Sequence, residues 1–200
     1  RDCLLSRGLG DVYKRQGDER LTKIVAAEGE FNEEDLIKEE QMVVALTHFG
    51  YIKRMPIDTY RSQKRGGKGI SGISTREEDF VKQIFTTSTH DTVLFFSNKG
   101  KLYRLRGYEI PEAGRTAKGT AIVNLLSLDA GEKISAVIPI SDFEDSKYLL
   151  MATKNGLIKK TPLQEYNSSR KTGLLAITLK DDDELIDVRL TDGQDNVVLV

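Results

Sequence analysis

Short apolar runs recur along the chain, and each is followed by a turn that ends in glycine and by a second short run. The runs are rich in β-branched and aromatic side chains, which predicts strands rather than helices. The first run of each unit lies at 42–46, 93–96 and 148–152. The turns end at Gly50, Gly100 and Gly156, which are 50 and 56 residues apart. The pattern therefore predicts a repeated strand–turn–strand unit with hairpin turns.

Each unit also contains a later strand-like segment, at 83–87, 134–138 and 184–190. Roughly four strands in about 50 residues is the size of a propeller blade. We therefore expect an all-β, propeller-like region at 42–200, with about three four-stranded units. The expected repeats are 42–91, 92–146 and 147–195, with the start of a fourth at 196. No segment after residue 42 has a sustained helical period.

The first 41 residues do not fit the repeat and divide into two parts. Residues 1–16 match nothing that follows and have the character of a translated adapter sequence, so they are left out of the fold prediction. Residues 17–41 are acidic, and Asn32 precedes acidic residues as the N-cap of a short helix would. This second part is predicted to be a short helical linker that leads into the first repeat.

Charge alternates in step with the repeat, although the formal net charge is only −1. The segments 50–74, 97–120 and 154–172 hold six, six and five cations against one, two and one acids. The spacers 126–148 and 180–195 hold five and seven acids against two cations each. Equivalent positions of a propeller lie at equivalent points of its rim, so the cations are predicted to form one positive stripe. Ordinary charged hairpin tips are the alternative interpretation.

The candidate phosphate-contacting cations follow the turn glycines or lie in later loops. They are Lys53, Arg54, Lys101, Arg104, Arg115, Lys118, Lys159, Lys160, Arg170 and Lys171. One further stretch packs three cations and three glycines into seven residues, Gln63, Lys64, Arg65, Gly66, Gly67, Lys68 and Gly69. Glycine lets a backbone approach a partner closely, and cations favour phosphate groups. This stretch is a candidate phosphate-contact loop, and a flexible, solvated basic loop is the alternative.

The seven-residue stretch, together with the segments 34–37, 78–80 and 121–126, resembles the C-terminal DNA-wrapping domain of bacterial DNA gyrase A. The resemblance covers 17–200 and makes Gln63 to Gly69 the gyrase box. It implies a β-pinwheel of an expected six blades, of which three and the first strand of a fourth would be present. It also implies sequence-nonspecific binding of double-stranded DNA in a positive wrap, which enables ATP-dependent negative supercoiling. The implied partners are gyrase B and a second copy of gyrase A, in the bacterial cytoplasm at the nucleoid.

The resemblance implies no chemistry in this stretch of chain. The family cleaves DNA with a tyrosine that directly follows an arginine, and none of the seven tyrosines here does so. Lys68 is followed by Gly69 rather than by Ser or Thr, so the box is not a Walker motif. ATP and Mg²⁺ would be used by other regions of the parent complex, and no cofactor is expected here. Cys3 is the only cysteine, so neither a disulfide framework nor a cysteine metal site is predicted.

Three other functions stay open on the sequence. A protein of the topoisomerase IV type carries a similar domain without an intact box. A propeller scaffold could use its rim cations to bind an acidic protein partner. An enzyme could use the box to cradle a nucleotide phosphate, although the strand-to-helix setting of such cradles is missing. No apolar run approaches the length of a membrane helix, so no membrane association is expected.

Overall fold

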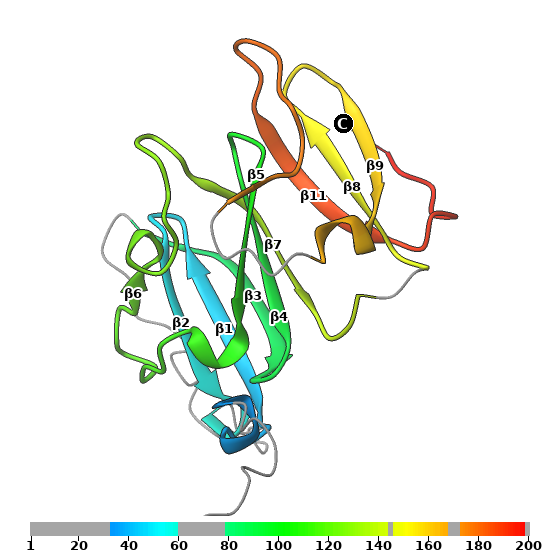
Figure 1. Ribbon diagram of the computed structural model, residues 1–200. Coiled ribbons are helices and arrows are strands. Elements are labelled where there is room, and N and C mark those ends of the chain that lie inside the picture. Colours follow the sequence, from blue (N-terminus) through cyan, green and yellow to red (C-terminus); the bar gives the residue numbers. More distant parts are fainter. Residues whose placement is uncertain (1–32, 60–78, 144–145, 168–172, 199–200) are drawn as a thin grey trace, which may run out of the picture. The chain divides into compact units, whose positions relative to one another are not determined.

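The computed structural model describes residues 33–59, 79–143, 146–167 and 173–198 (Figure 1). Its elements are η1 (Glu33–Leu36), β1 (Gln41–Thr47), β2 (Tyr51–Pro56), η2 (Ile57–Thr59), β3 (Val81–Ser88), β4 (Thr92–Ser97), β5 (Lys101–Arg106), η3 (Gly107–Glu109), β6 (Thr120–Ala121), η4 (Ile122–Asn124), β7 (Ile134–Ile140), β8 (Tyr148–Thr153), β9 (Ile158–Pro162), η5 (Leu163–Tyr166), β10 (Leu174–Leu175) and β11 (Leu185–Thr191), where η marks a short 3₁₀ helix. None of the helices in these ranges is long and apolar enough to cross a membrane.

The three predicted hairpins form with one turn geometry. In each, the amide of the turn glycine donates to a carbonyl three residues earlier at 3.0 Å, in the pairs Gly50–Thr47, Gly100–Ser97 and Gly156–Thr153. The glycine φ angles are 81°, 74° and 80°, in the left-handed region that favours glycine. A Ser or Thr hydroxyl accepts a further amide at the start of each following segment. Local sequence therefore explains all three turns.

The strands form three antiparallel sheets, in the orders β3-β1-β2-β6, β10-β5-β4-β7 and β11-β8-β9. β6 follows the second hairpin in the chain, yet it pairs with β2 of the first, and Figure 1 shows the green β6 beside the cyan β2. β10 follows the third hairpin and pairs with β5 of the second. The first two sheets are therefore each completed by a strand from the following repeat.

The predicted all-β class and the repeated sheets are confirmed, but the origin of the strands differs from the expectation. We expected each repeat to supply its own four strands, whereas the fourth strand of the first two sheets is borrowed. The third sheet has three strands among the described residues. Residues 192–198 form no strand, so a fourth repeat that begins at 196 stays a prediction.

The core consists of two apolar clusters that meet at β4. Val93 and Phe95 pack with the residues of the first sheet, whereas Leu94 and Phe96 pack with those of the third. All six residues of β4 are buried. The alternation of side chains along a strand explains this, because each face of the second sheet has an apolar neighbour.

Candidate nucleic-acid interface

One register position carries a cation in all three sheets. Arg54, Arg104 and Lys160 lie four residues after the turn glycines and pair with Val44, Leu94 and Leu150 respectively. We call these three residues the cation row. Because β2, β5 and β9 are the same strand of successive repeats, the row confirms that the positive charge found in the sequence recurs in step with the fold.

The cation row is held by the protein through contacts that use only part of each cation. Arg54 Nε donates to the Ile110 carbonyl at 2.7 Å, and its Nη1 lies 3.4 Å from the Glu112 carboxylate. The Arg104 guanidinium lies 6.0 Å from the ring centre of Phe143. Lys160 Nζ lies 4.3 Å from the ring centre of Tyr148 and donates one hydrogen bond, to the Gly193 carbonyl at 3.4 Å. Cation–π contacts orient a cation without using its donors, which stay available to an anion.

Lys53 lies next to the row and is buried. The residue is only 2% exposed, and burial lowers the pKa of its ammonium. Its Nζ donates to the carbonyls of Gly114, Arg115 and Ala117 at 3.0, 2.7 and 2.7 Å. An ammonium has three donors, so these bonds use all of them. The structure thus places the charge of Lys53 inside the protein, and a phosphate contact of Lys53 stays a prediction.

The same place in the other two sheets holds Tyr103 and Lys159. Tyr103 is buried and donates to Glu132 Oε2 at 2.9 Å. Burial, together with this bond to Glu132, raises the pKa of Tyr103 well above its usual range. Lys159 is exposed and donates to the Ala176 carbonyl at 3.0 Å. Of these three residues, Lys159 alone keeps a cation at the surface.

Lys101 begins β5 and shares its charge with a carboxylate. Its ammonium bonds Asp129, and this hydrogen bond raises the pKa of Lys101 and lowers the pKa of Asp129. Both side chains are at least partly exposed. Such a surface pair contributes little to stability, so an incoming phosphate could displace the carboxylate at low cost.

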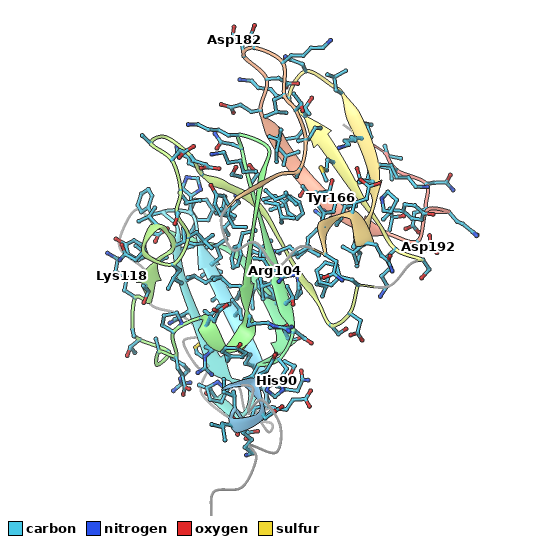
Figure 2. The ribbon with its side chains drawn as sticks, viewed as in Figure 1. His90, Arg104, Lys118, Tyr166, Asp182 and Asp192 are labelled. Atoms are coloured by element: carbon cyan, nitrogen blue, oxygen red, sulfur yellow. The ribbon has the colours of Figure 1, made fainter. Side chains whose placement is uncertain are left out.

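The loop 110–119 of the second repeat lies against β2 of the first and carries two candidate cations. Lys118 Nζ lies 3.7 Å from the ring centre of Tyr51, and Figure 2 labels Lys118 close to β6. Arg115 is half-buried, and its guanidinium makes no hydrogen bond or ion pair with the described residues. The other predicted contacts, Gln63 to Gly69, Arg170 and Lys171, lie outside the described residues.

Sequence reasoning missed a polar hollow of about 400 Å³ beside Arg104. Its lining includes Arg104, Arg106, Thr92, Ser141, Asp142, Phe143 and Asn167. Arg106 Nη1 donates to Thr92 Oγ1 at 3.0 Å, and its Nη2 lies 3.3 Å from the Glu34 carboxylate. The available signal was spacing, because residues two apart on a strand share a face. Arg104 supplies a cation to this hollow, whereas the charge of Arg106 is already paired with Glu34 and Asp142 adds a carboxylate to the lining.

Comparison with known proteins decides the family. The model of the family described as "DNA gyrase C-terminal domain, β-propeller" matches residues 41–88, 91–141 and 147–192, one segment for each repeat. The chain belongs to this family. DNA gyrase A of Clostridium acetobutylicum is 56% identical over 192 residues, which is 96% of this chain and 23% of that protein. The same protein of Halalkalibacterium halodurans is 52% identical, over 98% of this chain and 24% of its own length.

Two solved structures agree with the fold. The C-terminal domain of DNA topoisomerase IV gives a TM-score of 0.67 at 32% identity and covers 78% of this chain and 47% of its own. The DNA gyrase A C-terminal domain gives a TM-score of 0.59 at 30% identity and covers 76% of this chain and 48% of its own. The chain spans about a quarter of the length of the curated gyrase relatives named above. Its repeats are thus those of a gyrase C-terminal domain.

Proposed function

We propose that the chain is the DNA-binding and DNA-wrapping module of a DNA gyrase A protein. In this proposal it binds double-stranded DNA without sequence preference and curves it, which enables the parent enzyme to introduce negative supercoils with ATP. Gyrase B and a second copy of gyrase A are its partners, in the cytoplasm at the nucleoid. ATP and Mg²⁺ act in other regions of that complex, and this module contributes binding and geometry.

The recurring cation row is the observation that supports this proposal most strongly. A DNA duplex that is bent along successive sheets meets a cation at the same place in each one, at Arg54, Arg104 and Lys160. Lys118, Arg115 and Lys159 add further positive charge. Contacts of this kind neutralise phosphates and release counterions, so binding should weaken steeply with salt and depend little on base sequence.

A topoisomerase IV protein is the second candidate, because its C-terminal domain gives the higher TM-score of the two structures, 0.67 against 0.59. Sequence favours gyrase, since identity to gyrase A reaches 56% over nearly the whole chain. The intact stretch from Gln63 to Gly69 supports the same choice through its resemblance to the gyrase box. The two candidates differ in topology, because only a gyrase should hold DNA in a positive wrap.

A topology assay tests the proposal. The chain is bound to nicked plasmid, the nick is sealed with ligase, and the topoisomers are compared after the protein is removed. We expect a positive shift in linking number that grows with protein and disappears at high salt. A chain that binds the plasmid without any shift would be a binding module and not a wrapping one. A chain that does not bind at low salt would overturn the proposal.

The box is tested in the complete gyrase A protein together with gyrase B. Replacing Lys64, Arg65 and Lys68 with alanine should keep much of the DNA affinity, because the other cations remain. Supercoiling should be lost, since bending DNA around a small rim costs on the order of several kcal/mol that only contacts in the bent state offset. Relaxation should survive. The matched control replaces the exposed Lys133, Lys180 and Arg189, which lie in the acidic spacers, and it should supercoil at the parent rate.

A further inference from the structure

The contact between Lys53 and the loop 110–119 joins two repeats through a single charge. The three carbonyls that accept from Lys53 Nζ belong to Gly114, Arg115 and Ala117, more than 60 residues along the chain. Along the chain, these carbonyls come directly before Arg115, at Arg115 itself and directly before Lys118. The ammonium therefore fixes the backbone from which two candidate DNA contacts project.

The neighbours of Lys53 hold the two ends of the same loop. Before the bend, the Arg54 amide donates to the Pro111 carbonyl, and the Ala113 amide returns a bond to the Arg54 carbonyl, both at 3.1 Å. After the bend, Gly119 adopts a φ of +89° and passes so close to β2 that a Cβ would lie 2.6 Å from the Ile52 carbonyl. The ends are held by backbone contacts to β2, whereas the bend itself is joined to β2 by the Lys53 side chain. Within the bend, the Ala117 amide donates to the Gly114 carbonyl at 3.1 Å, so the carbonyls of Arg115 and Ala117 depend on Lys53 alone.

Carbonyl oxygens that converge on one point repel one another unless a cation lies between them. Residues 114–117 turn three such oxygens inward, onto Lys53, and the Arg115 guanidinium is left without a hydrogen bond or ion pair among the described residues. Without the ammonium, the bend would have to rotate its carbonyls back to water. That rotation would also redirect the side chains of the bend.

We infer that Lys53 is a positioning residue, which holds the loop 110–119 so that Arg115 and Lys118 meet DNA phosphates, and that it makes no phosphate contact itself. This inference rests on the proposed DNA-binding function. In the sequence Lys53 looks like a rim contact, but the inference gives it a role at the junction between two repeats.

The first test uses the unaltered chain and measures how fast each lysine is acetylated, by mass spectrometry, with and without duplex DNA. Lys53 should react at least about tenfold more slowly than Lys159, because a buried group reacts only when the structure opens locally. Adding DNA should protect Lys118 and Lys159 and change the rate at Lys53 by less than about twofold. A Lys53 that reacts freely and is protected by DNA would overturn the inference.

The second test is a double-mutant cycle on DNA affinity between Lys53→Met and the pair Arg115→Ala and Lys118→Ala. In the parent, Lys53→Met should lower the salt slope, which is the steepness of log affinity against log salt concentration, by about 1.8. This is the value for two lost phosphate contacts, because both loop cations lose their place. In the Arg115/Lys118 background it should weaken binding by less than about twofold. Lys159→Met, the same substitution at the equivalent place, should lower the slope by about 0.9, as one lost contact does.

The outcomes separate the two proposals. Additive losses, or a slope change of a single contact at Lys53, would mean that Lys53 binds phosphate directly, and the inference would fall while the DNA-binding function stands. If Lys53→Met weakened DNA binding through a general loss of structure, its effect would remain in the Arg115/Lys118 background and add to theirs. That result would also overturn the inference. If the parent chain shows no salt-dependent DNA binding, both proposals fall. If Lys53→Met does not fold, the acetylation rates of the unaltered chain still decide.

Discussion

Gly100 and Gly156 occupy the same place in the second and third hairpins, yet their surroundings differ. Both close the turn with the same 3.0 Å bond and similar φ angles. At Gly100, the carbonyl accepts the amides of Ala176 and Ile177, and a Cβ would lie 2.5 Å from the Ile177 carbonyl. At Gly156, a Cβ would meet nothing within 4 Å. Each turn is closed locally, but of these two only the tip at Gly100 is covered by residues of the following repeat that the structure describes.

Lys53 and Lys159 repeat this difference with side chains. They pair with Ala45 and Met151, which are equivalent positions of β1 and β8. Lys53 is covered by the loop of the next repeat and buried, whereas Lys159 is exposed. The same residue at the same place is therefore a structural group in one repeat and a surface cation in another. In an array of repeats, what a position does depends on its neighbour.

Alanine at the turn glycines should give the largest contrast. Gly156→Ala should cost about 1–2 kcal/mol, the ordinary cost of a left-handed L-residue. Gly100→Ala adds a clash with the backbone of the next repeat and should cost about 3–5 kcal/mol in total. Unfolding in urea measures both. Equal costs at the two positions would mean that the tip of the second hairpin is not packed against residues 176–177.

Methionine at the two equivalent lysines should give the next contrast. Lys53→Met keeps most of the apolar stem but leaves the carbonyls of Arg115 and Ala117 without a donor, so it should lower the free energy of unfolding by about 1–3 kcal/mol. Lys159→Met removes one exposed bond and should change it by less than about 0.5 kcal/mol. The urea unfolding midpoint is the measurement. If Lys159→Met cost as much as Lys53→Met, the loop over Lys53 would not be what makes the difference.

The elements that could be predicted from the sequence are those with local causes. Gly50, Gly100 and Gly156 predict the hairpins because each turn requires a left-handed residue. The borrowed strands could not be predicted, because Thr120–Ala121 and Leu174–Leu175 are two residues each and show no alternation. Their pairing with the preceding repeat is a long-range contact that no local pattern reports. The repeat therefore predicted the number of units correctly but not which repeat completes each sheet.

The candidate site divides in the same way. The cation row was found because the register of a hairpin preserves sequence spacing. The burial of Lys53 was missed, although a signal existed. Residues two apart on a strand share a face, and Met55, two residues after Lys53, is 1% exposed. A lysine that shares a face with a strongly apolar residue is a candidate for a covered position, and Lys159, which shares its face with Thr161, carries no such signal.

The smallest expected effect is on stability in acid, and it concerns the turn of the third hairpin. This turn is bonded by Asp183, which belongs to the same repeat. Asp183 Oδ1 accepts the amides of Asn155 and Glu184 at 3.0 and 2.9 Å. Burial acts to raise the pKa of the Asp183 carboxyl, but these amides and the Thr153 side chain outweigh it and hold the pKa below its usual 3.8. A carboxyl with a lowered folded pKa stabilises the fold above its unfolded pKa and loses this contribution as pH falls through the folded pKa.

Asp183→Asn should therefore be less stable than the parent at neutral pH, and the difference should close as the pH falls below 3.8. Urea unfolding across this range is the measurement. Asp182→Asn is the matched control, because Asp182 is exposed, makes no hydrogen bond to the described hairpin and has a φ of 63° that asparagine tolerates. It should follow the pH profile of the parent. A difference between parent and Asp183→Asn that stays constant with pH would mean that the Asp183 charge does not cap this turn, and that the third hairpin is closed by Gly156 and Thr153 alone.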